Sequence, residues 1–170
     1  MNNPQREVMT WEVFGRASRQ LARQIAVSPW KPELIICIAR GGLVLGGALS
    51  YALDMKTIGS INVEFYTGMN DTLAQPRILD PQIEISAELG SRALVVDDVA
   101  DSGRTLRMVM EMMADGSLRD TKGNPVRYDA RSAVLYEKPG TVIKPDYCWR
   151  ATDKWINFPW STKPPVNTNE

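Results

Sequence analysis

The segment ALVVDDVADSGRTL, residues 93–106, constrains the fold more than any other part of the chain. It opens with an apolar run, 93–96, typical of a strand buried on both faces. Asp97 and Asp98 follow directly, and Ser102-Gly103 then opens a stretch with helical spacing. A buried strand, a polar loop and a helix in this order predict an α/β fold whose polar side chains gather where the strand ends.

The rest of the chain alternates in the same way. Strands are expected over 33–39, 57–66, 92–99, 128–137 and 146–151. Helices are expected over 11–25, with Thr10 as the capping residue, and over 44–53 and 103–114. Residues 68–90 carry turn formers and little periodicity, which predicts a long loop able to act as a lid. This order of elements predicts a mainly parallel sheet with helices on both faces.

Composition narrows the class of protein. The 170 residues, 44% hydrophobic and 24% charged, are enough for one domain spanning 1–170. Equal numbers of basic and acidic residues give a net charge of zero, so no overall field attracts nucleic acid or an anionic membrane. The longest uncharged stretch, 41–53, is shorter than the roughly 18 residues of a membrane span, and the N-terminus lacks an apolar signal core. We therefore expect a cytoplasmic protein with no nucleic-acid or membrane partner.

Two residue types limit the chemistry. The sequence contains no histidine, which excludes Ser-His-Asp triads and most zinc sites. Catalysis must then use carboxylates, lysine, arginine, backbone dipoles or a metal bound through oxygen. Cys37 and Cys148 lie among apolar neighbours in expected strands, so we expect buried thiols rather than a disulfide.

The end of the strand at 92–99 has the chemistry of a sugar phosphate site. Adjacent carboxylates such as Asp97 and Asp98 accept hydrogen bonds from vicinal hydroxyls and can hold Mg²⁺. Four residues later, Ser102-Gly103-Arg104-Thr105 opens a helix whose free N–H groups favour a phosphate. Together they indicate ribose 5-phosphate. The alternative on spacing alone is an acidic turn with Ser102 as an ordinary helix cap.

The same segment resembles the phosphoribosyl pyrophosphate signature of the type I phosphoribosyltransferases. Four further segments are similar, in order, to the xanthine-guanine phosphoribosyltransferases: MTWEVFGRASRQLARQI, IARGGLVLGGAL, LYEKPG and DKWINFPW. The resemblance implies an enzyme that transfers ribose 5-phosphate from phosphoribosyl pyrophosphate to N9 of a 6-oxopurine (xanthine, guanine or hypoxanthine) in purine salvage. It also implies Mg²⁺ as cofactor, release of pyrophosphate, and a homodimer or homotetramer.

The resemblance assigns roles around the sugar phosphate. It implies that Asp97 and Asp98 hold the ribose hydroxyls and Mg²⁺, and that Asp101 faces N7 of the purine and manages its proton. The residues that wrap the 5-phosphate would be Ser102, Gly103, Arg104 and Thr105. The match to the pyrophosphate loop, where the family has a cis non-proline peptide bond, covers Arg40, Gly41 and Gly42.

The resemblance also implies a hood over the base at about 138–165. In it Lys138 contacts the exocyclic oxygen at C6, Trp155 stacks on the base and the Ile156 backbone reads its edge; Trp160 is expected to be structural packing. The flexible loop corresponds to about 66–90, with Tyr66 near its root and Arg77 as a candidate phosphate contact. Residues 115–126 look inserted, at the end of the sheet away from the site.

Two other classes of protein share features with this sequence. A regulatory protein of the same fold would bind nucleotide and RNA or DNA without turnover, and would need a basic surface stripe. Only Arg16, Arg19 and Arg23 share a helix face, where solvated charges are the simpler explanation. A receiver domain also places an acidic pair near a strand end, but it needs neither the phosphate loop nor Arg40-Gly41-Gly42. The sequence does not report which 6-oxopurine is preferred.

Overall fold

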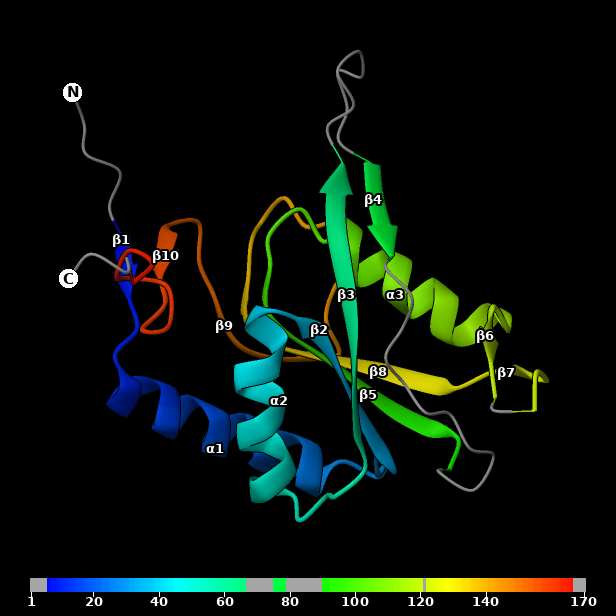
Figure 1. Ribbon diagram of the computed structural model, residues 1–170. Coiled ribbons are helices and arrows are strands. Elements are labelled where there is room, and N and C mark those ends of the chain that lie inside the picture. Colours follow the sequence, from blue (N-terminus) through cyan, green and yellow to red (C-terminus); the bar gives the residue numbers. More distant parts are fainter. Residues whose placement is uncertain (1–5, 67–74, 79–89, 121, 167–170) are drawn as a thin grey trace.

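The computed structural model describes residues 6–66, 75–78, 90–120 and 122–166 (Figure 1). Its centre is a six-stranded sheet in the order β4-β3-β2-β5-β8-β9. In chain order these strands are β2 (Leu34–Ala39), β3 (Ile58–Tyr66), β4 (Gln75–Ile78), β5 (Arg92–Ala100), β8 (Asp129–Glu137) and β9 (Tyr147–Ala151). Neighbouring strands are parallel except for β4, which runs antiparallel to β3.

Helices cover both faces of the sheet, as the sequence predicts. Within the described residues these are α1 (Trp11–Val27), α2 (Gly41–Ala52) and α3 (Arg104–Asp115). Figure 1 shows α1 and α2 on one face and α3 on the other. The expected cap is present, because the backbone N–H of Val13 donates to Thr10 Oγ1 at 3.3 Å. None of these helices is both long and apolar enough to cross a membrane.

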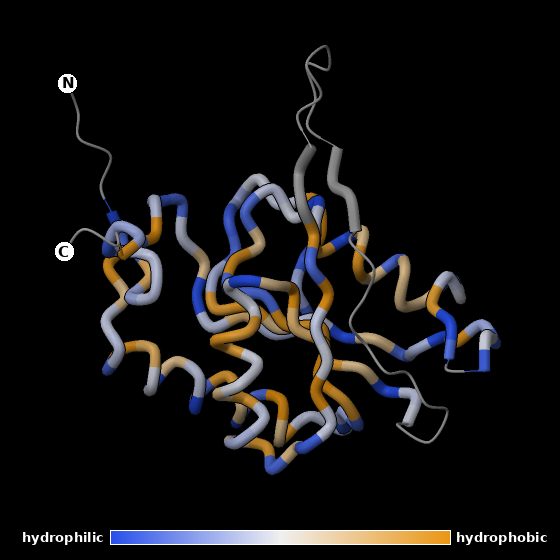
Figure 2. The backbone as a smooth tube through the Cα atoms, viewed as in Figure 1, coloured by the Kyte–Doolittle hydropathy of each residue, from blue (hydrophilic) through white to orange (hydrophobic). Residues whose placement is uncertain are grey.

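The continuous apolar runs of the central strands contribute side chains to two hydrophobic cores, one on each face of the sheet. Successive side chains of a strand point to opposite faces, and β2 follows this rule: Ile35 and Cys37 pack with the α1 and α2 side, whereas Ile36 and Ile38 pack with α3. Both faces of β2, β5 and β8 are therefore buried, and Figure 2 shows hydrophobic residues along these central strands. This two-sided burial explains why these strands show no polar alternation.

Two small sheets flank the main one. The strand β1 (Arg6–Val8) pairs in parallel with β10 (Trp155–Asn157), which brings the two ends of the described chain together. The strands β6 (Leu118–Arg119) and β7 (Pro125–Val126) form an antiparallel pair after α3. This pair lies within the segment 115–126 that is expected to be inserted, and Figure 1 places it at the far end of α3.

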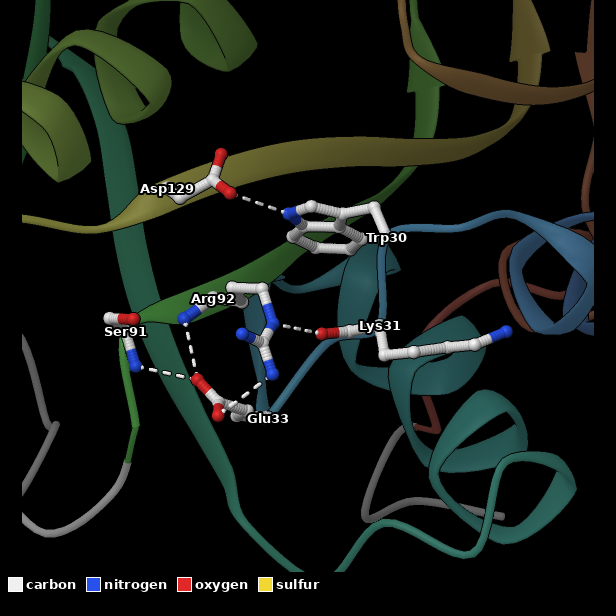
Figure 3. A network of polar contacts seen from close by, with 6 residues as sticks. All are labelled: Trp30, Lys31, Glu33, Ser91, Arg92 and Asp129. Atoms are coloured by element: carbon white, nitrogen blue, oxygen red, sulfur yellow. Dashed lines mark hydrogen bonds and ion pairs between the residues drawn. The ribbon is translucent and has the colours of Figure 1, made fainter.

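Hydrogen bonds tie the amino ends of the central strands together (Figure 3). The Glu33 carboxylate accepts from the backbone N–H groups of Ser91 and Arg92 at 2.7 and 3.0 Å, and from Arg92 Nη2 at 2.9 Å. These backbone hydrogen bonds lower the pKa of Glu33. Nearby, Trp30 Nε1 donates to Asp129 Oδ2 at 2.8 Å. The sheet is thus fixed in register at the end opposite its carboxyl edge.

The structure differs from the sequence predictions at several points, among them the short strands β6, β7 and β10, which were not expected. The loop expected over 68–90 contains β4, whose Pro76 reads as a turn former but is tolerated in an edge strand. No strand was expected at β1, which depends on pairing with a segment about 150 residues away. Cys37 is buried as expected, but Cys148 is half-buried; both are free thiols. Burial raises the pKa of Cys37 to about 12 and that of Cys148 to about 11.

Candidate active site

The carboxyl ends of β2 and β5 meet at the point where the strand order reverses. From β2 the chain passes through α2 to β3 on one side, whereas β5 pairs with β2 on the other side. Ligands of open α/β sheets bind at such a switch point, because the loops from the two strands diverge there. The Arg40-Gly41-Gly42 turn follows β2, and Asp97 and Asp98 lie near the end of β5.

Two glycines allow the start of α2 to pack tightly against β5. A Cβ on Gly41 would lie 2.0 Å from Asp98 Oδ2, and a Cβ on Gly42 would lie 2.3 Å from the Val96 carbonyl oxygen. Both distances are far below a van der Waals contact, so a larger residue would have to displace the Asp98 carboxylate at position 41 or the β5 backbone at position 42. The peptide bond between Ala39 and Arg40 is cis, which agrees with the resemblance of this turn to a pyrophosphate loop.

The two acids form one coupled group. The backbone N–H of Asp98 donates to Asp97 Oδ1 at 2.8 Å, and both side chains are half-buried. Burial, with the charge of Asp98 as a second cause, raises the pKa of Asp97 well above its usual value. Burial also raises the pKa of Asp98, although hydrogen bonding to Asp97, the backbone and Trp160 lowers it. The pair therefore favours a hydrogen-bond donor or a cation as partner.

A small pocket of about 210 Å³ lies at the start of α3. Gly103 precedes the helix with φ of 73°, a conformation that favours glycine, and a Cβ there would lie 2.1 Å from Thr141 Oγ1. The loop is held from outside by the backbone N–H of Val142, which donates to the Ser102 carbonyl at 2.9 Å. The residues that line the pocket are Asp97, Val99, Ala100, Asp101, Ser102, Gly103, Thr105 and Leu106.

A second pocket, of about 470 Å³, lies between the end of β5 and the C-terminal segment. Its side chains combine two cations, one carboxylate, aromatic rings and small polar groups. They are Arg6, Val99, Asp101, Lys138, Trp155, Ile156, Asn157, Phe158, Ser161 and Thr162. Trp155 is 63% exposed and Ile156 is buried, so the indole is open to a ligand while Ile156 anchors the wall. Lys138 Nζ donates to the Lys154 carbonyl in the same wall.

The two pockets share Val99 and Asp101. The small polar pocket is therefore adjacent to the larger, partly aromatic one, and Asp101 contributes to the lining of both. A ligand with a phosphorylated end and a flat apolar end fits this arrangement, because the helix start favours an anion and the rings favour a planar group.

Most of the predicted site residues lie together at this edge. Asp97, Asp101, Ser102, Gly103 and Thr105 line the smaller pocket, and Lys138, Trp155 and Ile156 line the larger one. Asp98 and Gly41 contact each other directly behind them.

Other predicted residues lie elsewhere or outside the description. Arg40 and Arg104 are exposed and line neither pocket. Tyr66 is the last residue of β3 and Arg77 lies in β4, so the structure describes the backbone at these two positions. Most of the expected loop at 66–90 lies outside the described residues.

The sequence did not indicate Arg6 or Asn157 as site residues. Both line the larger pocket because β1 pairs with β10. Trp160 packs as expected, stacked on Phe158 with ring centroids 4.8 Å apart and edge-on to Phe14 at 5.4 Å.

Comparison with known proteins establishes the family to which this chain belongs. The phosphoribosyl transferase domain model matches residues 4–166. The chain belongs to the phosphoribosyltransferase family. It is 32% identical over 158 residues to a xanthine-guanine phosphoribosyltransferase of Gluconobacter oxydans, with 92% of this chain and 84% of that protein covered.

Two solved structures are similar to this phosphoribosyltransferase. A purine phosphoribosyltransferase from Pyrococcus horikoshii Ot3 superposes with a TM-score of 0.72 and 34% identity, covering 96% of this chain and 99% of that one. The Helicobacter pylori xanthine-guanine-hypoxanthine phosphoribosyltransferase has a TM-score of 0.75 and 26% identity, covering 92% of this chain and 94% of that one. The chain is thus an enzyme of the phosphoribosyltransferase family with the mainly parallel α/β fold of these relatives.

Proposed function

We propose that this enzyme transfers ribose 5-phosphate from phosphoribosyl pyrophosphate to N9 of a 6-oxopurine and releases pyrophosphate. The observation that carries the proposal is that the two pockets are adjacent and share Val99 and Asp101. One pocket has the helix-start geometry that suits a phosphate, and the other has the ring and cation that suit an oxopurine. The substrates of the related enzymes named above support the same reaction.

The smaller pocket would hold the sugar phosphate. In this proposal the 5-phosphate binds to the hydroxyl groups of Ser102 and Thr105 and to the backbone N–H groups at the start of α3. The carboxylates of Asp97 and Asp98 accept hydrogen bonds from the ribose hydroxyls. Arg104, exposed beside this loop, would add positive charge near the phosphate. The exposed Arg40 and the backbone at Gly41 would face the pyrophosphate across the acid pair.

Mg²⁺ is the cofactor we propose for the acid pair. Two adjacent carboxylates whose burial disfavours their charge are a donor set that fits a hard divalent cation together with substrate oxygens. When bound by Asp97 and Asp98, Mg²⁺ would neutralise charge on the pyrophosphate and make it a better leaving group.

The larger pocket would hold the base. Lys138 donates to the oxygen at C6, which selects against the amino group of adenine, while Trp155 offers a ring face and Ile156 its backbone. Asp101 would face N7 and hold the proton that the base must shift as N9 attacks. No nucleophilic side chain is needed, because the orientation of base and sugar and the stabilisation of the leaving group lower the barrier.

The test is pyrophosphate release from phosphoribosyl pyrophosphate with xanthine, guanine, hypoxanthine, adenine and uracil in parallel, with Mg²⁺ and with a chelator. We expect turnover with 6-oxopurines only, and its loss in the chelator. Binding of phosphoribosyl pyrophosphate without turnover of any base would contradict the proposal. It would favour instead a regulatory protein that binds nucleotide and RNA or DNA.

We also propose that the chain forms a homodimer or homotetramer. The helix α2 carries no charged residue, and it exposes Leu43 (45%) and Tyr51 (92%), which are about two helical turns apart. Ile58 (47%) at the start of β3 is also exposed. A helix that is apolar all round is normally covered on every side. Light scattering of the intact protein should give twice or four times the 19.0 kDa chain mass, and Tyr51→Glu should shift it toward that of one chain. A wild-type monomer would contradict this.

Two wider expectations from the sequence stay part of the proposal. We propose that residues 1–170 fold as one domain, since β1 and β10 join the two ends of the chain. A cytoplasmic location is in keeping with two free thiols, because thiols persist in reducing compartments. Limited proteolysis tests the first, as one domain should resist cleavage between α3 and β8.

A further inference from the structure

The wall of the base pocket opposite the main sheet carries a guanidinium. Arg6 lies on β1, where its backbone pairs with Trp155 of β10. Its Nη1 donates to Asn157 Oδ1 at 3.3 Å, and both side chains line the pocket of about 470 Å³. The pocket therefore holds two cations, Lys138 on the sheet side and Arg6 on the side formed by the first and last strands.

We propose that Arg6 is a specificity-determining residue that selects purines with an oxo group at C2, so that xanthine is preferred over guanine and hypoxanthine. The inference rests on the proposed function, in which Asp101 faces N7 and Lys138 faces C6. N7 and the oxygen at C6 lie on the same side of a purine, whereas C2 follows C6 on the other side of N1 and points away from N7. A base held by Asp101 and Lys138 then turns C2 away from Asp101, and Arg6 is the other cation that lines the same pocket.

The hydrogen-bonding capacity of a guanidinium decides between the three bases. Arginine has five N–H donors and no acceptor. Asn157 takes one of these donors, which leaves others for a ligand. The 2-oxo group of xanthine accepts such a hydrogen bond with the added strength of the charge. The 2-amino group of guanine is itself a donor and cannot accept, and hypoxanthine carries only hydrogen at C2.

The surroundings of Arg6 hold its side chain in place, and within the described residues it forms no ion pair. Met9 N–H donates to the Asn157 carbonyl at 3.0 Å, which fixes the register of the two segments. Glu7, the next residue on β1, forms an ion pair with Arg150 at 3.1 Å instead. Among the residues that line the described pocket, Asp101 is the only carboxylate, and the proposal places it at the N7 side.

The experiment compares kcat/KM for xanthine and for guanine at saturating phosphoribosyl pyrophosphate and Mg²⁺. The proteins are wild type, Arg6→Met, Arg6→Lys and Arg19→Met, the last a control for loss of an exposed arginine on α1. We expect wild type to favour xanthine, and Arg6→Met to lower the xanthine-to-guanine ratio about tenfold, mainly through xanthine. Arg6→Lys should keep part of the preference, and Arg19→Met all of it. A wild-type preference for guanine, or a ratio unchanged in Arg6→Met, would overturn the inference.

A binding measurement separates this inference from the proposed function. Calorimetric titration with xanthosine and guanosine 5′-monophosphates needs no turnover, and Arg6→Met should weaken the xanthosine nucleotide about tenfold more than the guanosine nucleotide. If no purine is turned over, the proposed function fails. The nucleotide titration still tests whether Arg6 recognises the group at C2. Equal weakening of both nucleotides would show that Arg6 does not read C2.

Discussion

At Gly41 the backbone of α2 meets the Asp98 carboxylate so closely that no side chain fits between them. We expect Gly41→Ala to push the carboxylate aside and lower kcat/KM for phosphoribosyl pyrophosphate by about a hundredfold, because small displacements of positioned groups are costly. Gly15→Ala is the matched control, since a Cβ there meets nothing within 4 Å. It should keep full activity and raise the free energy of unfolding by up to about 1 kcal/mol. Equal activity of the two variants would contradict this role of Gly41.

At the scale of single elements, the pairing of β1 with β10 builds one wall of the base pocket but touches nothing in the phosphate pocket. Removal of residues 1–8 should therefore raise KM for the purine about tenfold or more and leave KM for phosphoribosyl pyrophosphate nearly unchanged. Glu7→Gln, which removes the ion pair with Arg150 but keeps the strand, should have little effect. A parallel rise in both KM values on truncation would mean that β1 supports the whole fold instead.

These elements also show which parts of the fold and of the site can be predicted from the sequence. The alternation of strands and helices along the chain, the cap at Thr10 and the acids at the end of β5 were predictable, because each leaves a local pattern within a few residues. The strands β1 and β4 were not, because three or four residues become a strand only through a distant or edge partner. Arg6 and Asn157 were missed for this reason, since no local spacing marks either as a pocket residue. Trp155 was found only through the family resemblance.

At the scale of the whole molecule, burial of the central strands on both faces should make the free energy of unfolding fall at alkaline pH. Burial raises the pKa of Cys37 from 9.0 to about 12. Above about pH 9 the unfolded chain releases this proton while the native state keeps it, so stability falls as pH rises toward 12. The Cys37 share of this slope is about 1.4 kcal/mol per pH unit. Urea unfolding at several pH values should show a smaller slope in Cys37→Ala. Identical slopes would mean that this thiol is not held protonated.

Asp101 lines both pockets of the proposed active site, so the most direct measurement is kcat/KM of Asp101→Asn for the preferred purine. Asp153→Asn, exposed and outside both pockets, is the control. We expect Asp101→Asn to lose about a hundredfold or more, with KM for phosphoribosyl pyrophosphate nearly unchanged, as for loss of a group that moves a proton in the transition state. Activity within about threefold of wild type in both variants would contradict the assignment of the active site.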